Sequence, residues 1–173
     1  MTPVEFRRHL HRHPELSFRE TESARFIAEA LREAGIPCRP IAGTGVLAKI
    51  EGRGDLRRAV VLRADIDALP IREQSGAAWS SENDGVMHAC GHDIHAAVLY
   101  GTLLRLSAER NFEGTLFGIF QPGEESNPGG ASKVLAENPF EGYTVLAVVG
   151  AHVEPALDAG TLGLPHGKHL APN

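Results

Sequence analysis

Cysteine is scarce in this chain of 173 residues, which contains only Cys38 and Cys90, about fifty residues apart. Two distant cysteines do not form a disulfide framework, and in a reducing compartment a cysteine serves metal binding, catalysis or simple burial. We expect a structural role for Cys38. Cys90 differs, because it lies in the stretch MHACGHDIHAA with His88, His92 and His95. Such a concentration of soft and borderline metal ligands needs a chemical explanation.

Long apolar runs and an excess of basic charge are also absent. No uncharged apolar run approaches the roughly 20 residues of a membrane-spanning helix, and the first residues lack the apolar core and cleavage site of a secretory signal. We therefore expect a cytoplasmic location and no membrane partner. The net charge of −5 gives no general attraction to phosphate backbones, so we expect no nucleic-acid partner. The local basic run FRRHLHRHP is interpreted as the solvated face of a short opening helix.

Apolar patterning predicts the first elements of an α/β domain. Apolar residues at spacings of three and four predict an amphipathic helix that follows Ser17 or Phe18 and ends at Gly35. Residues 45–52 and 58–67 are predicted strands, joined as a hairpin by the turn GRGDL. The Arg-Gly-Asp triplet is therefore interpreted as a turn and not as an adhesion motif. The run VVL in the second strand is typical of a strand buried on both faces.

The second half of the chain continues this alternation. A polar loop at 73–85 precedes a predicted helix at 92–109, a strand at 114–122, a helix at 129–138 and another buried strand at 144–153. Strands that alternate with helices indicate a layered α/β fold with a largely parallel sheet.

Chemically active side chains cluster around the predicted strand ends. In an open α/β sheet ligands bind beyond the carboxyl ends of the strands, so we expect these side chains to meet at one edge. They are Asp65 and Asp67, Cys90 and His92, Glu124 and Glu125, and His152. Taken singly, each also fits a turn former, a solvated charge or a satisfied histidine. Their convergence favours a functional site.

The residue types in this set suit metal-assisted hydrolysis. Gly91 lets the backbone turn tightly, so that Cys90 and His92 can point at one centre, where they would bind zinc or a similar divalent ion. Glu124 and Glu125 are adjacent, and we expect them to point in different directions, one to the metal and one to the substrate. A metal lowers the pKa of bound water, and the free carboxylate takes its proton and later passes it to the leaving amine.

The same motifs resemble a known family, the metal-dependent amidohydrolases that include hippurate hydrolase, N-acyl-amino-acid amidohydrolase (aminoacylase) and the indoleacetyl-amino-acid hydrolases, relatives of the zinc carboxypeptidases. The matching segments, in order, are HRHPELSFRETESARFI, LRADIDALPI, MHACGHDIHAA, FQPGEE and GAHVEP. The resemblance covers nearly the whole chain. It implies a zinc-peptidase-like three-layer sandwich, with a largely parallel mixed sheet flanked by helices. It also implies a dinuclear-metal hydrolase whose small-molecule substrates are N-acyl amino acids.

The resemblance implies roles for single residues. The metal ligands it implies are Cys90, His92, Glu125 and His152. Cys90 can be shared between two ions in this arrangement. Glu124 would be the general base and acid. Asp65 would lie near the metals, in the shell of residues next to the ligands. The ions would be zinc or manganese, two per site in the full-length family and one or two held weakly here, with nickel and cobalt left open. Gly123 stands where family members often have alanine, a small departure.

Family members are roughly twice as long as this chain. We therefore expect residues 1–173 to be the N-terminal portion of a catalytic domain, truncated before the lid or dimerisation domain and lacking the C-terminal catalytic segment with its last metal-binding histidine. We expect exposed apolar surface that favours a homodimer, and little activity from this portion alone. His166 and His169 are interpreted as flexible tail residues and not as replacement ligands.

Two other functions stay open. One is a noncatalytic metal-binding or partner-binding α/β module. The other, a thiol enzyme built on Cys90, is weaker because no second cysteine lies nearby. Within the motif, Asp93 suits the positive end of the following helix, and we favour a structural role for His95 over the support of a metal ligand.

Overall fold

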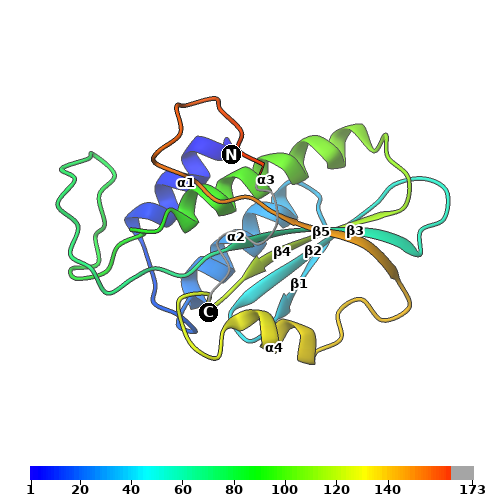
Figure 1. The fold of residues 1–173 in the computed structure, drawn as a ribbon, viewed down its shortest axis with the longest axis horizontal. Helices are drawn as coiled ribbons and strands as arrows, with labels where there is room; N and C mark the ends of the chain where they lie inside the picture. Colours follow the sequence, from blue (N-terminus) through cyan, green and yellow to red (C-terminus); the bar gives the residue numbers. More distant parts are fainter. Residues whose placement is uncertain (165–173) are drawn as a thin grey trace.

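The computed structural model describes residues 1–164 as three layers, with one mixed sheet between two layers of helices. The strands are β1 (Cys38–Ile41), β2 (Gly45–Glu51), β3 (Arg58–Asp65), β4 (Thr115–Gln121) and β5 (Thr144–Gly150). Helices α1 (Pro3–Arg12), α2 (Thr21–Glu33) and α3 (His92–Glu109) cover one face, and α4 (Gly130–Ala136) covers the other (Figure 1). The expected three-layer fold is confirmed. Among the described helices, none is both long and apolar enough to cross a membrane.

The sheet order is β1-β2-β4-β3-β5, so β4 lies between β2 and β3. β2 is antiparallel to β4, whereas β3 is parallel to both β4 and β5. The predicted hairpin between β2 and β3 is therefore wrong, although Asp55 still accepts a turn hydrogen bond from the Arg58 amide. β4 is buried at all seven positions, which requires a central place in the sheet. The observed hairpin joins β2 to β1, a strand that the sequence did not predict.

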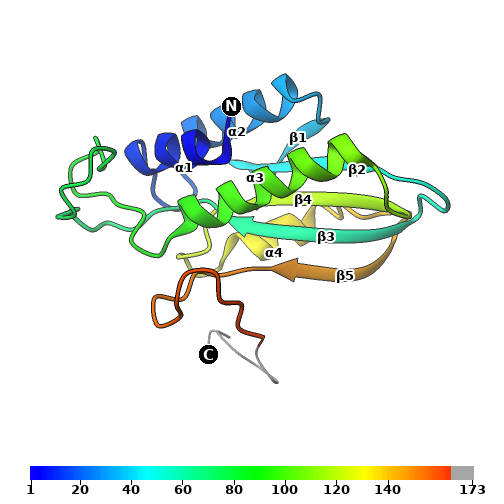
Figure 2. The same cartoon turned by 90° about the horizontal axis from the view of Figure 1, so that it is seen from above.

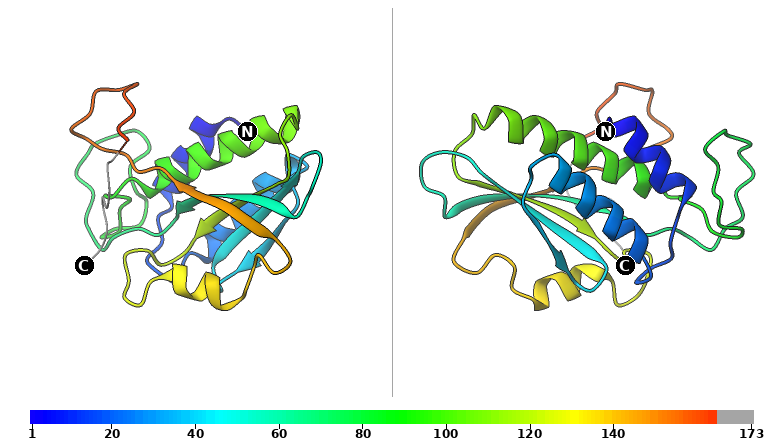
Figure 3. Two further views of the ribbon diagram at one scale, coloured as in Figure 1. Left: turned by 45° about the vertical axis from the view of Figure 1, so that its right-hand side comes forward. Right: turned by 180° about the vertical axis from the view of Figure 1, so that it is seen from behind.

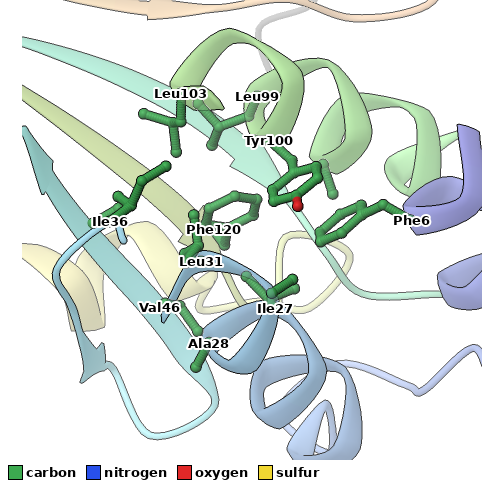
Figure 4. Packing of buried hydrophobic residues seen from close by; sticks show 14 of the residues in the cluster. Phe6, Ile27, Ala28, Leu31, Ile36, Val46, Leu99, Tyr100, Leu103 and Phe120 are labelled. Carbon is green, nitrogen blue, oxygen red and sulfur yellow. The ribbon is translucent and has the colours of Figure 1, made fainter. Parts of the chain in front are cut away.

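The larger core lies between the three N-terminal helices and the sheet. The rings of Phe6 and Tyr100 stack with centroids 4.3 Å apart, and Phe120 of β4 packs beside them (Figure 4). The predicted apolar faces of α2 and α3 point into this core, where Ile27 and Leu103 are completely buried. Each large side chain buried in this way contributes about 1.5–3 kcal/mol. This core holds α3 against the sheet, and the first residue of α3 is the candidate metal ligand His92.

Helix α1 differs from its sequence interpretation. Its start is fixed by a capping box between Thr2 and Glu5. The basic run is only partly a solvated face, because His11 is buried and Arg7 forms an ion pair with Asp93 at 2.9 Å. Helix α1 lies along α3, and the loop at 73–85 extends beyond the end of α1 (Figure 3). The charged residues thus join two helices.

The prediction that β5 is buried is wrong. β5 lies at the edge of the sheet and pairs only with β3 within the described part of the chain (Figure 2). Leu146, Val148 and Val149 are each more than half exposed. An apolar strand has the same sequence pattern whether or not another layer covers it, so the sequence could not reveal this exposure. The expected exposed apolar surface is confirmed, while dimerisation stays a prediction.

Candidate metal centre

Among residues 1–164, three groups of potential ligand atoms lie at the carboxyl ends of the parallel strands. They are Cys90, His92 and His152; Asp65, His92 and His95; and His92, Glu124 and Glu125, with the ligand atoms of each group within 4.8 Å of one another. Asp65 ends β3, the two glutamates follow β4 and His152 follows β5. The predicted meeting of strand ends is therefore observed, and His92 belongs to all three groups.

His92 is the first residue of α3 and is buried. Its Nδ1 atom lies 3.2 Å from Oδ1 of Asp67, which directs Nε2 toward the centre. Nε2 has no hydrogen-bond partner among the described residues, although oxygens of Asp65, Glu124 and Glu125 lie 3.7, 3.8 and 3.6 Å away. These separations are too long for hydrogen bonds, but they fit ligands that each contact one ion at about 2.0–2.2 Å. The residues present thus fit a divalent metal.

Cys90 and His152 form the outer side of the centre. The Sγ atom of Cys90 lies 3.5 Å from Nε2 of His152. His152 donates through Nδ1 to the carbonyl oxygen of Val153 at 2.7 Å, so Nε2 keeps its lone pair toward Cys90. Burial, together with the negative charges of Glu125, Asp65 and Glu124, raises the pKa of the Cys90 thiol to about 12. Gly91, with φ of 86°, supplies the tight turn expected between Cys90 and His92.

Glu124 and Glu125 do not point in different directions, contrary to the sequence expectation. Both place a carboxylate oxygen within 4 Å of Nε2 of His92. The chain bends at both residues, and the loop after β4 is held at Gly123 and at Glu125 by hydrogen bonds. Glu124 is the more exposed of the two, with 38% of its side chain accessible against 23% for Glu125. Burial and the charges of Asp65 and Glu125 raise the pKa of Glu124.

Asp65 and His95 form a hydrogen-bonded pair behind His92. Nδ1 of His95 lies 2.6 Å from Oδ1 of Asp65, and Nε2 of His95 accepts a hydrogen bond from the Val153 amide at 3.0 Å. Although burial alone would raise it, the pKa of Asp65 is lowered to about 2 by the His95 bond and by the charges of His92 and Arg63. His95 thus connects the strand end at Asp65 to the segment that carries His152, which agrees with a structural role beside the centre.

Comparison with known proteins now identifies the family. Residues 61–167 match the model of peptidase family M20/M25/M40. The chain belongs to this family. An N-acetyl-L-cysteine deacetylase of Bacillus subtilis is 44% identical over 170 residues, which are 97% of this chain and 40% of that protein. An N-acyl-L-amino acid amidohydrolase of Geobacillus stearothermophilus is 41% identical over 170 residues, 97% of this chain and 45% of that protein.

A solved structure supports the same M20 assignment. The YXEP protein of Bacillus subtilis, described as a dinuclear metal-binding peptidase from the M20 family, matches with a TM-score of 0.89 and 44% identity. The match covers 95% of this chain and 46% of that one. The chain therefore spans less than half the length of these M20 relatives. The zinc-peptidase-like fold and the expected amidohydrolase relationship are confirmed.

The sequence did not reveal the partners of two aspartates beside this M20 centre, Asp67 and Asp93. Asp67 was recognised only as a strand-end carboxylate, yet it orients His92. Its alternation with Asp65 after a strand was the available signal. Asp93 is buried against α1, where it pairs with Arg7 and His11, in addition to lying in the first turn of α3. No local pattern could reveal those partners.

Two residues of the quoted motifs, His88 of MHACGHDIHAA and Gly123 of FQPGEE, pack in ways that the sequence did not indicate. His88 belongs to none of the three ligand groups, and burial lowers its pKa to about 4. A Cβ atom on Gly123 would approach the ring of Phe18 to 2.4 Å, so alanine at this position would require this ring to move. His166 and His169 lie outside the described residues.

Proposed function

We propose that this chain carries the metal site of a hydrolase that cleaves the amide bond of N-acyl amino acids. The observation that carries the proposal is the buried Nε2 atom of His92, which lacks a hydrogen-bond partner in the described chain and faces three carboxylates at 3.6–3.8 Å. A fixed imidazole lone pair that faces several carboxylates is the environment of a divalent cation. The named activities of two relatives support the substrate class.

The ligands in this proposal are Cys90, His92, Glu125 and His152. Asp65 lies next to His92, outside the ligand set, and accepts a hydrogen bond from His95. The mixed sulfur, nitrogen and oxygen donors of the ligands suit zinc, and manganese is the second candidate. When bound, a divalent ion lowers the pKa of water and polarises the amide carbonyl.

Glu124 is the general base in this proposal. Its carboxylate is exposed enough for substrate to reach, and its pKa is raised by burial and by neighbouring carboxylates. A carboxylate with a raised pKa accepts a proton from water and returns it to the leaving amine more readily than an ordinary glutamate does. Glu124 would therefore move the proton while Glu125 and His92 stay with the metal.

We further propose that residues 1–173 form the N-terminal portion of the catalytic domain. Relatives more than twice as long support this proposal. In such a protein the additional chain would supply a lid and the last metal-binding histidine. A cytoplasmic location and a homodimer stay predictions from the sequence.

The test compares the wild-type chain with Glu124→Gln after loading with zinc or manganese. Metal binding is measured by isothermal titration calorimetry, and hydrolysis of a panel of N-acetyl amino acids is followed by release of the free amine. The proposal expects weak wild-type turnover that Glu124→Gln abolishes while metal is retained. Equal turnover in both proteins contradicts the role of Glu124. A wild-type chain that binds metal without turnover favours the noncatalytic module.

A thiol enzyme is disfavoured by the surroundings of Cys90. A nucleophilic cysteine needs a lowered pKa, whereas burial and three carboxylates raise the pKa of this thiol to about 12. The proposal expects Cys90 to react slowly with iodoacetamide and more slowly still with zinc present. Rapid alkylation that zinc does not affect would support the thiol enzyme.

A further inference from the structure

The loop that carries Glu124 is held on both sides by buried carboxylates. The Gly123 amide donates to Oε1 of Glu20 at 2.7 Å, and the Glu125 amide donates to Oδ2 of Asp67 at 2.9 Å. Glu124 lies between these two anchored amides. The backbone on either side of Glu124 is therefore held by two acceptors outside its own loop.

Glu20 is completely buried. It lies in the segment between α1 and α2 and reaches across the fold to Gly123, while its second oxygen accepts a hydrogen bond from the Thr44 hydroxyl. Burying a carboxylate is costly unless each oxygen has a partner. Capping of α2 does not explain the burial of Glu20, because the Glu20 side chain makes no cap hydrogen bond to this helix. The Ser23 amide near the start of α2 is instead satisfied by Glu15, at 2.8 Å.

The segment at 15–20 also touches the second anchor and the loop itself. The Ser17 hydroxyl donates to Oδ2 of Asp67 at 2.6 Å. The Phe18 ring lies against Gly123, and the backbone of Phe18 itself has a φ of 60°. The Nζ atom of Lys133 in α4 lies 3.4 Å from the centroid of the same ring. The segment at 15–20 thus contacts the Glu124 loop through Phe18 and Glu20, and it contacts Asp67, the second anchor, through Ser17.

We propose that Glu20 is a positioning residue, which acts through the Gly123 amide to hold Glu124 and Glu125 in the metal centre. This inference rests on the proposed function for its catalytic meaning. Its structural part concerns only the bond between Glu20 and the loop. Glu20 itself contacts neither metal nor substrate in this account.

The test uses the 173-residue chain in five forms: wild type, Glu20→Ala, Glu20→Gln, Thr44→Val and the control Glu15→Ala. Exchange of the Gly123 and Glu125 amides is measured by NMR, and zinc affinity is measured by isothermal titration calorimetry. Loss of an orienting hydrogen-bond partner typically weakens metal binding about 10- to 100-fold. We expect this loss of zinc affinity, and faster exchange at Gly123, in Glu20→Ala. Glu20→Gln keeps an oxygen for the Gly123 amide and should restore both values to near wild type.

Thr44→Val covers the case in which Glu20→Ala fails to fold, because valine matches threonine in shape and removes only the hydroxyl that holds Glu20. It should cause the same two changes to a smaller extent. Glu15→Ala is the matched control, since it removes a carboxylate of the same segment that caps α2. We expect it to lower the midpoint of thermal unfolding without changing zinc affinity or exchange at Gly123.

Three results would overturn the inference: unchanged exchange at Gly123 in folded Glu20→Ala, no recovery in Glu20→Gln, or a loss of zinc affinity in Glu15→Ala as large as in Glu20→Ala. A wild-type chain that binds no zinc would instead contradict the proposed function. In that case amide exchange at Gly123 still decides whether Glu20 holds the loop.

Discussion

The Nδ1 atom of His92 lies 3.2 Å from Oδ1 of Asp67, and the other oxygen of this carboxylate accepts the Glu125 amide at 2.9 Å. One buried aspartate therefore orients a histidine and a glutamate that we propose as metal ligands. The hydrogen bond at Nδ1 fixes the tautomer of His92 and leaves the Nε2 lone pair for the metal.

Replacing Asp67 by asparagine is predicted to weaken zinc binding about 10- to 100-fold, as removal of such orienting partners generally does. The amide cannot accept from both His92 and the Glu125 amide, and it lacks the charge that strengthens the imidazole as a ligand. Competition with a fluorescent zinc chelator measures the change. The same replacement at Asp84, an exposed partner of Arg72, should leave zinc affinity unchanged. Equal affinities in wild type and Asp67→Asn would contradict this role.

Zinc affinity is predicted to increase with pH. The Cys90 thiol has a pKa raised to about 12 and must lose its proton to bind metal. The bond to Asp67 and the charges of Asp65 and Asp67 outweigh burial and raise the pKa of His92, so protons also compete for this ligand. Lower pH therefore protonates the ligands and weakens binding. Calorimetry in buffers of different ionisation enthalpy should show proton release, and binding enthalpies independent of the buffer would contradict it.

Gly91→Ala is predicted to lower both stability and zinc affinity. The φ of Gly91 is 86°, and a Cβ atom there would approach Cγ2 of Val153 to 2.5 Å. Gly76 has a φ of 66° with no heavy atom near its ideal Cβ position, so Gly76→Ala carries the left-handed cost of about 1–2 kcal/mol alone. Urea unfolding should show a larger loss for Gly91→Ala, and only this variant should bind zinc more weakly. Equal losses in the two variants would show that the contact with Val153 is unimportant.

Two histidines on α1 are predicted to change stability in opposite directions with pH. The hydrogen bond to Asp93, and a second one to Glu73, raise the pKa of His11 despite its burial. Protonated His11 thus stabilises the fold below about pH 6.5, and this contribution is lost as pH rises through its raised pKa. Burial first, and the charge of His13 next, lower the pKa of His9. Its contribution is present above about pH 6.5 and is lost as pH falls.

Urea unfolding of His11→Gln and His9→Gln across this pH range tests both signs. The loss of stability in His11→Gln should shrink as pH rises, whereas the loss in His9→Gln should shrink as pH falls. Parallel pH profiles for the two variants would contradict the assignment. Neither histidine belongs to the three ligand groups, so metal is left out of the experiment.

The parts of this structure that follow from local pattern could be predicted. The apolar spacing of α2 and α3 identified both helices, because one face of each is buried. The ends of parallel strands share one edge, so Asp65, Glu125 and His152 could be expected near one centre, where each falls in a ligand group with His92.

Features that depend on distant partners could not be predicted. β4 separates β2 from β3 because strand order reflects pairing across the whole chain, and the exposure of β5 depends on which layer covers it. The bonds from Asp67 to His92 and from Glu20 to the Gly123 amide join residues far apart in sequence. Each of these residues resembles an ordinary loop carboxylate until the fold brings its partner near.

The metal content of the chain tests the central claim most directly. The 173-residue protein, Cys90→Ala and His92→Ala are incubated with zinc or manganese, desalted and analysed by elemental mass spectrometry, with circular dichroism to confirm folding. The account predicts one or two retained ions per wild-type chain and far fewer in both variants, because each variant removes a member of the ligand groups. A folded wild-type chain that retains no ion, or variants that retain as many as wild type, would contradict it.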